Sequence, residues 1–183
     1  MAALDGKTIA ILTVTEGVEQ VELTSPREAL EEAGATTVLV STEDGEVQGF
    51  DHLTKADTFP VDRTIDDADV ADFDGLLLPG GVANPDNLRM HSDAVAFAKG
   101  FFDAGKPVAA ICHAAWTLVE ADVVDGRALT SWPSLQTDIE NAGGTWKDEE
   151  VLVCEGGPNT LVTSRNPDDL PAFEREAISA FSN

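Results

Sequence analysis

The stretch Pro107–His113, with the sequence PVAAICH, decides how this chain folds. Its first five residues are apolar from end to end, and such a short run is typical of a strand buried on both faces of a sheet. A helix-like segment, Ala114–Ala121, follows without an intervening loop. The sequence therefore predicts a buried strand that passes directly into a helix, with Cys112 at the junction.

Strand-like and helix-like segments alternate in both directions from this junction. The predicted strands are Thr8–Val14, Thr37–Ser41, Asp74–Leu78, Pro107–Ile111, Leu129–Trp132, Thr145–Trp146, Val151–Cys154 and Leu161–Ser164, with His52–Leu53 and Thr58–Val61 as candidate edge strands. The predicted helices are Val21–Ala33, Asp93–Ala104, Ala114–Ala121, Ser134–Ala142 and Asp169–Phe181. Because no repeat or linker interrupts this alternation, we expect one doubly wound α/β domain over residues 1–183. Its sheet should be mostly parallel, with helices on both faces.

Charge is the most unusual bulk property of the sequence. Thirty-four acidic residues against eleven basic ones give a formal net charge of −23. Such a field repels nucleic acid and anionic lipid surfaces, so we expect neither nucleic acid nor a membrane as a partner. The acidic residues are spread from Glu16 to Glu176 and form no tail. This distribution favours a halophilic protein, because high salt screens the self-repulsion.

The remaining bulk features predict a cytoplasmic protein. The longest apolar runs are too short to span a bilayer, and Met1–Lys7 lacks the basic and apolar regions of a signal peptide. Two cysteines, Cys112 and Cys154, and three histidines suggest neither a disulfide framework nor a zinc site. A disulfide between the two cysteines is disfavoured in a reducing cytosol.

The predicted architecture indicates where a ligand would bind. In open α/β sheets, ligands bind beyond the carboxyl ends of the strands. Three segments follow such strand ends, namely Thr15–Glu22, Pro79–Arg89 and Cys112–His113. All of the candidate functional residues lie in these three segments.

Cys112 is the strongest candidate for chemistry. A strand that turns at once into a helix exposes the residue at the turn, as the nucleophile elbow does for serine. The start of a helix also stabilises negative charge and so lowers the pKa of a thiol. A buried, inert cysteine is the ordinary alternative. The position of Cys112 at the junction favours a reactive thiol.

Several neighbours are candidates for supporting roles. His113 is the next residue, and it would act either as a base or through its backbone N–H in an oxyanion hole. One of the three glutamates Glu16, Glu19 and Glu22 would lie close to the thiol. Burial would raise the pKa of that carboxyl, and in its protonated form it would donate a hydrogen bond to the sulfur. The residues themselves leave open which glutamate does so.

The segment after the third predicted strand offers backbone rather than side chains. Gly80 and Gly81 allow the chain to approach a ligand closely with N–H groups free for an oxyanion, whereas a simple tight turn is the ordinary explanation. Asp86 and Arg89 follow in what we expect to be the same loop. An ion pair or a helix cap would also account for both residues.

Five segments of the sequence resemble the ThiJ/PfpI family, specifically its PfpI-like intracellular protease and deglycase branch. They are Gly17–Pro26, Phe73–Gly81, Gly105–His113, Gly126–Ser131 and Leu161–Pro171. The matching segments occur in the family's order and span nearly the whole chain. The resemblance implies a flavodoxin-like fold of the class I glutamine amidotransferase-like group, with a nucleophile elbow.

The resemblance also implies roles for individual residues. Cys112 would be the nucleophile, His113 its partner, and Glu19 the carboxyl that contacts the cysteine. In oligomeric relatives an acidic residue of a neighbouring subunit orients the histidine, and the matching position here is Asp86. We therefore expect a homo-oligomer, whether a dimer, a trimer or a hexamer.

Three activities agree with this resemblance. The first is cysteine-dependent chemistry on reactive dicarbonyls or their early protein adducts, of the glyoxalase III or deglycase type. The second is an intracellular cysteine peptidase, in which the amides of Gly81 and His113 would stabilise the oxyanion. The third is a non-catalytic stress chaperone or redox sensor in which Cys112 is oxidised. We rank dicarbonyl chemistry first, and none of the three requires a cofactor or a metal.

Overall fold

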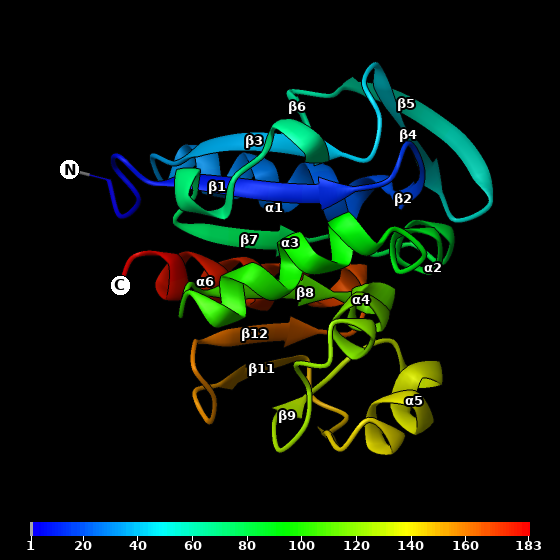
Figure 1. Ribbon diagram of the computed structural model, residues 1–183, viewed down its shortest axis with the longest axis vertical. Helices are drawn as coiled ribbons and strands as arrows, with labels where there is room; N and C mark the ends of the chain where they lie inside the picture. The colour runs from blue at the N-terminus through cyan, green and yellow to red at the C-terminus, as the bar shows by residue number, and fades with distance from the viewer. Residues whose placement is uncertain (1) are drawn as a thin grey trace.

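Seven strands form the central sheet of the protein, whose residues 2–183 are described by a computed structural model (Figure 1). The strand order is β11-β12-β8-β7-β1-β3-β6. The strands are β1 (Thr8–Thr13), β3 (Thr36–Ser41), β6 (Arg63–Thr64), β7 (Gly75–Leu78), β8 (Val108–Ile111), β11 (Val151–Cys154) and β12 (Leu161–Ser164). All neighbouring pairs are parallel except β11 and β12, which form an antiparallel hairpin. The mostly parallel α/β sheet predicted from the sequence is confirmed.

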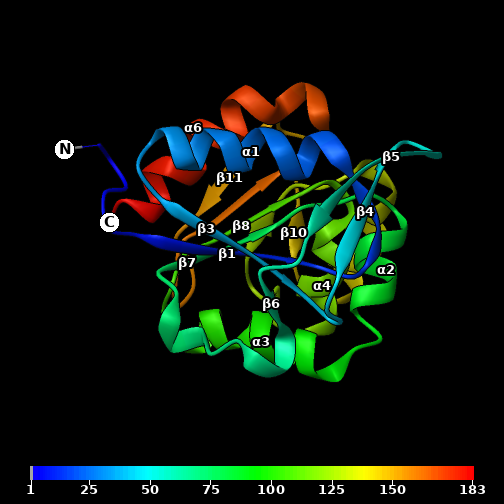
Figure 2. The same ribbon diagram turned by 90° about the horizontal axis from the view of Figure 1, so that it is seen from above.

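Helices cover both faces of this sheet. They are α1 (Gln20–Glu32), α2 (Ala83–Leu88), α3 (Ser92–Asp103), α4 (Ala115–Glu120), α5 (Gln136–Asn141) and α6 (Leu170–Phe181). Figure 2 shows α1 and α6 on one face and α3 on the other. Within residues 2–183, no helix combines the length and the apolar character needed to cross a membrane.

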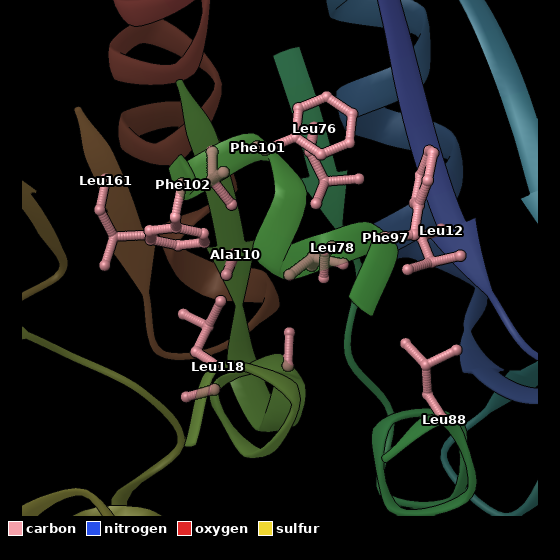
Figure 3. Packing of buried hydrophobic residues seen from close by; sticks show 14 of the residues in the cluster. Leu12, Leu76, Leu78, Leu88, Phe97, Phe101, Phe102, Ala110, Leu118 and Leu161 are labelled. Carbon is pink, nitrogen blue, oxygen red and sulfur yellow. The ribbon is translucent and has the colours of Figure 1, made fainter. Parts of the chain in front are cut away.

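Strand residues alternate between two hydrophobic clusters because successive side chains of a strand point to opposite faces. In β1, Ala10 and Leu12 belong to the cluster beneath α3, whereas Ile9 and Ile11 belong to the cluster beneath α1 and α6. Figure 3 shows side chains of the first cluster, including the phenylalanines of α3 over the sheet. Burial on both faces explains why these strands have uninterrupted apolar sequences.

Two smaller sheets flank the central one. Strands β2 (Glu16–Glu19), β4 (Glu46–Asp51) and β5 (Thr54–Pro60) form the first, and β9 (Ala128–Leu129) and β10 (Thr145–Trp146) form the second. The edge strand predicted at His52–Leu53 is wrong, because these two residues form the turn between β4 and β5. The strand predicted at Leu129–Trp132 is shorter than expected, since only Leu129 of these residues belongs to a strand, β9.

Helix α2 occupies the segment for which we expected a loop. The buried side chain of Asn84 fixes this helix, since its Oδ1 accepts from the Val14 amide at 2.9 Å. Its Nδ2 donates to the Pro79 carbonyl at 3.0 Å. These bonds tie α2 to the carboxyl ends of β1 and β7, where the candidate site lies.

Candidate active site

Cys112 directly follows β8 and is the first residue of a 3₁₀ turn, Cys112–Ala114, that leads into α4. Its backbone φ of 62° lies in the left-handed region, which non-glycine residues rarely adopt. Such strain is found at functional sites, where the surrounding structure holds it in place. The nucleophile elbow expected from the sequence is therefore present.

Two glycines close one side of the elbow. A side chain at position 80 would place its Cβ 2.7 Å from the Cβ of Cys112, so only glycine fits there. Gly81 has a φ of 81° and directs its N–H to the Cys112 sulfur, as does the amide of His113. The amide of Gly80 instead donates to Glu22 Oε2 at 3.0 Å. Gly80 thus orients a carboxyl and has no N–H free for an oxyanion, contrary to our expectation.

Glu22 is the carboxyl that contacts the thiol, and the assignment of that contact to Glu19 is corrected. Glu22 lies in the first turn of α1, is completely buried and hydrogen-bonds Cys112. Glu19 precedes the helix in an extended conformation, and its carboxylate accepts from the His52 amide at 3.1 Å. The helix begins at Gln20, so the two glutamates point in different directions.

A sequence signal for Glu22 existed. Residues four apart share a helix face, and Glu22, Pro26 and Leu30 follow this spacing. All three are buried in the structure. Glu22 is therefore the glutamate on the apolar, buried face of α1.

Burial controls the protonation of this pair. It raises the pKa of Glu22 to about 8, and the nearby charge of Glu19 acts in the same direction, while hydrogen bonds from Cys112 and Gly80 oppose the rise. Burial also raises the pKa of the Cys112 thiol, and a charged Glu22 raises it further. At neutral pH Glu22 holds a proton and carries no charge, so it can donate to the sulfur and favour the thiolate.

His113 contacts the same sulfur. Its Nδ1 lies 3.1 Å from the Cys112 Sγ, and its ring stacks on Trp132 with centroids 5.4 Å apart. Burial lowers the pKa of His113 to about 4, so the imidazole is neutral at neutral pH. A neutral ring can accept the thiol proton or donate to the thiolate, depending on its tautomer.

Asp86 does not reach His113 within the chain. It lies in α2 rather than in a loop, and its Oδ1 pairs with Arg89 Nη2 at 3.1 Å. The Arg89 guanidinium lies over the ring of Trp116, 5.1 Å from its centroid, and Trp116 contacts His113. A role for Asp86 across a subunit interface stays a prediction.

A cavity of about 410 Å³ opens above the thiol. Its walls come from β2, the β4–β5 turn, the loop after β7 and the elbow, and its apolar lining is Phe50, Leu53, Val82, Ala83, Trp132 and Pro167. This volume suits a small ligand. The sequence did not predict the part of the wall formed by Phe50 and Leu53.

One group of side chains at the cavity rim has metal-ligand chemistry. Ligand atoms of Glu19, Asp51 and His52 lie within 4.8 Å of one another. Asp51 and His52 are exposed, and Glu19 already accepts a hydrogen bond from the His52 amide. This bond joins the end of β2 to the β4–β5 turn.

Known proteins with similar sequences match this chain over nearly its whole length. Residues 7–180 match the model of the DJ-1/PfpI family. The chain is 43% identical over 173 residues to the putative cysteine protease YraA of Bacillus subtilis, covering 94% of this chain and 97% of that protein. It is 42% identical over 176 residues to protein/nucleic acid deglycase 2 of Escherichia coli, covering 94% and 96%.

Solved structures agree with this match. A two-domain protein of Anabaena variabilis with DJ-1/ThiJ/PfpI-like and ferritin-like domains superposes with a TM-score of 0.84 at 32% identity, over 94% of this chain and 47% of that one. A ThiJ/PfpI domain protein of Brachyspira murdochii shares the fold, with a TM-score of 0.86 at 20% identity over 96% of each chain. This chain belongs to the DJ-1/PfpI family.

Proposed function

We propose that this protein is a Cys112-dependent enzyme that acts on reactive dicarbonyls or their early adducts without a cofactor. The observation that carries the proposal is the buried carboxyl of Glu22 against the Cys112 sulfur. A carboxyl with a pKa of about 8 is poised to give and take a proton near neutral pH. The cavity above it admits a small carbonyl compound, and relatives include a protein/nucleic acid deglycase.

In the first step the neutral His113 takes the proton of the Cys112 thiol, and the resulting thiolate adds to the aldehyde carbon of a substrate such as methylglyoxal. The carbon–sulfur bond forms while the carbonyl electron pair moves to oxygen. The amides of Gly81 and His113, which donate to the Cys112 sulfur, would stabilise this oxyanion. Glu22 gives its proton to the oxygen, and the product is a hemithioacetal.

The second step is a proton shift between two carbons. Glu22, now a carboxylate, removes the proton from the former aldehyde carbon and returns it to the neighbouring carbon, while the hydroxyl proton of the first carbon moves to the oxygen of the second. The hemithioacetal becomes a thioester of lactate. Water then adds to the thioester, the carbon–sulfur bond breaks, and lactate leaves with the thiol restored.

Peptide hydrolysis is the second candidate, because a relative is named a putative cysteine protease. The same thiolate and amides would form an acyl-enzyme from a peptide carbonyl. The β4–β5 turn contributes His52 and Leu53 to the wall of the cavity, whose volume of about 410 Å³ suits a small substrate better than an extended peptide. We rank dicarbonyl chemistry first on this ground.

The test is methylglyoxal consumption with lactate detection in molar potassium chloride. Wild type and Cys154→Ser, which changes the other thiol, should both produce lactate, whereas Cys112→Ala should lose turnover because the nucleophile is gone. Turnover that persists in Cys112→Ala would refute the proposal, as would well-folded wild type that makes no lactate. In the latter case, an acyl-enzyme detected by mass spectrometry would support the peptidase. Stoichiometric oxidation of Cys112 without turnover would support a redox sensor.

A further inference from the structure

Carboxylates at the cavity above the thiol outnumber the cations there. Glu16 and Glu19 belong to its lining, and among residues 2–183 that lining includes no lysine or arginine. The two side chains that contact the Cys112 sulfur add no charge at neutral pH, because Glu22 holds its proton and His113 is neutral. We therefore expect a negative potential in the cavity.

Glu19 is the less exposed of the two carboxylates. Its side chain is only 12% exposed, and its carboxylate accepts from the His52 amide at 3.1 Å. Burial and then the charge of Glu19 raise the pKa of Glu22, so this charge acts on the group beside the sulfur. A charge that is partly withdrawn from water is screened less than one on the surface. Glu19 should therefore contribute most of the potential at the thiol.

Two basic side chains lie near these carboxylates. Lys55 Nζ is 3.6 Å from Glu16 Oε2, but both side chains are exposed, and such pairs are weak. His52 lies between Glu19 and Asp51, with its Nδ1 3.9 Å from Glu19 Oε2 and its Nε2 4.0 Å from Asp51 Oδ1. Even a charged imidazole would offset only one of these two carboxylates. An excess of negative charge therefore remains at the rim of the cavity.

Aromatic rings in the lining favour the same kind of ligand. Phe50 and Trp132 line the cavity, and Trp132 stacks on His113 while it stays 39% exposed. The face of an aromatic ring attracts cations, and indole does so most strongly. Carboxylates bind ammonium and guanidinium groups through charge-assisted hydrogen bonds. Two independent features of the lining thus favour a positively charged ligand.

We propose that this cavity selects its substrates by charge, accepting dicarbonyl compounds or adducts that carry a positive charge and discriminating against anionic ones. Glu19 is the main determinant, and Glu16 adds to it. The class of substrate is then an adduct on an amine or a guanidine that stays cationic, rather than one on a carrier with carboxylates or phosphates. The identity of the reacting carbonyl rests on the proposed function, whereas the selection by charge is a property of the cavity alone.

The first arm of the test labels Cys112 with two methanethiosulfonate reagents of opposite charge at pH 7 and low salt. One carries a trimethylammonioethyl group and the other a sulfonatoethyl group, and in both the thiolate displaces methanesulfinate. Cys154→Ser serves as the parent, because Cys112 is then the only thiol. Each rate is divided by the rate of the same reagent with free 2-mercaptoethanol. The corrected ratio of cationic to anionic labelling should be at least about tenfold.

Single-charge variants show where the selection arises. Glu19→Gln should lower the ratio about three- to fivefold, and Glu16→Gln should lower it less. Lys55→Gln should raise the ratio, because the partial neutralisation of Glu16 is lost. A glutamine at position 19 can still accept the His52 N–H, so this variant should fold. Because each result is a ratio, any change in the intrinsic reactivity of the thiol cancels.

Glu32→Gln is the matched control. Glu32 is exposed at the far end of α1, roughly 18 Å along the helix from Gln20, so this variant removes one charge away from the cavity. It should leave the ratio unchanged. A ratio near one in the parent would overturn the proposal. An equal fall in Glu32→Gln and Glu19→Gln would also overturn it, because the selection would then come from the net charge of the whole molecule.

The second arm compares the turnover of two arylglyoxals by wild type. One bears a trimethylammoniomethyl group on its ring and the other a carboxymethyl group, and the mandelate products are measured. We expect kcat/KM to be at least about tenfold higher for the cationic compound, and Glu19→Gln should narrow the difference. Equal kcat/KM for the two compounds would refute selection by charge while the proposed function stands. Selective labelling of Cys112 without turnover of either arylglyoxal would instead refute the proposed function and leave the selection by charge in place.

Discussion

The proton on Glu22 couples the chemistry of the site to the stability of the fold. Its pKa is about 8 in the folded protein, against an ordinary value of 4.5 for an exposed glutamate. Between these values the folded protein holds one more proton than the unfolded chain, so its free energy of unfolding must fall as pH rises. The contribution of this group is at most about 1.4 kcal/mol per pH unit.

Replacing Glu22 with Gln removes this group from the titration. Between pH 4.5 and about 8, we expect the free energy of unfolding of Glu22→Gln to fall less steeply with pH than that of wild type, because the contribution of Glu22 is absent. Urea denaturation measures this slope. Turnover should fall by about 100-fold, because an amide cannot transfer the proton. KM should change little, since the amide keeps the size and polarity of the carboxyl.

Glu19→Gln is the matched control for this prediction. Glu19 is the last residue of β2 and lies outside the contact with the thiol, so this variant should keep the downward slope, which should end at a somewhat lower pH because the charge of Glu19 helps to raise the pKa of Glu22. A Glu22→Gln protein whose unfolding free energy falls with pH as steeply as that of wild type would contradict the prediction.

At this same scale the sequence located the thiol at the elbow but not the carboxyl that contacts it. Cys112 could be identified because an apolar strand that turns directly into a helix leaves one residue at the turn. The spacing of Glu16, Glu19 and Glu22 left the choice open, and the resemblance then favoured the wrong one. Which carboxyl is buried depends on the residue at which α1 begins, and helix starts are uncertain by one or two residues.

At the scale of elements, the β4–β5 hairpin forms part of the wall of the cavity above the thiol. Its turn residue Leu53 lines the cavity although its side chain is 95% exposed. An exposed side chain contributes little to folding stability, so replacing Leu53 should affect contact with a substrate rather than the stability of the fold.

Leu53→Ser should therefore raise KM several-fold and leave kcat and the melting temperature nearly unchanged, as measured by steady-state kinetics and thermal denaturation. The reason is that the apolar side chain of Leu53 would contact the substrate equally in the ground state and in the transition state. Its loss should therefore weaken binding without slowing the chemical step. Met90→Ser is the control, because Met90 is 80% exposed and lies outside the cavity lining. Equal changes in KM for both variants would contradict a role for the hairpin in substrate binding.

The elements that the sequence missed share a physical cause. Strand β5, with the sequence TKADTFP, was predicted only in its last part, as the edge strand Thr58–Val61, because it exposes most of its side chains and shows little hydrophobic periodicity. Helix α2 has six residues and is fixed by the polar side chain of Asn84, which no pattern of apolar residues reveals. The central strands were predictable because two clusters bury both of their faces.

At the scale of the whole molecule, charge is the dominant property. A formal net charge of −23 on 183 residues gives a repulsion that unfolding would relieve. The Debye length falls from about 10 Å at 0.1 M salt to about 3 Å at 1 M, so added salt weakens this repulsion more in the compact state than in the expanded chain. The assembly of subunits that we expect would bring like charges closer still and strengthen the dependence on salt.

We expect the melting temperature to rise by about 5–10 °C between 0.1 M and 2 M potassium chloride, as measured by circular dichroism. A variant with Glu43→Gln, Asp66→Asn and Glu149→Gln removes three exposed negative charges from separate parts of the surface. It should melt higher than wild type at low salt and gain less from added salt, because less repulsion remains to be screened. If wild type and the variant gained equally, the salt would be acting through the hydrophobic core or water rather than through charge, and the acidic surface would not be an adaptation to salt.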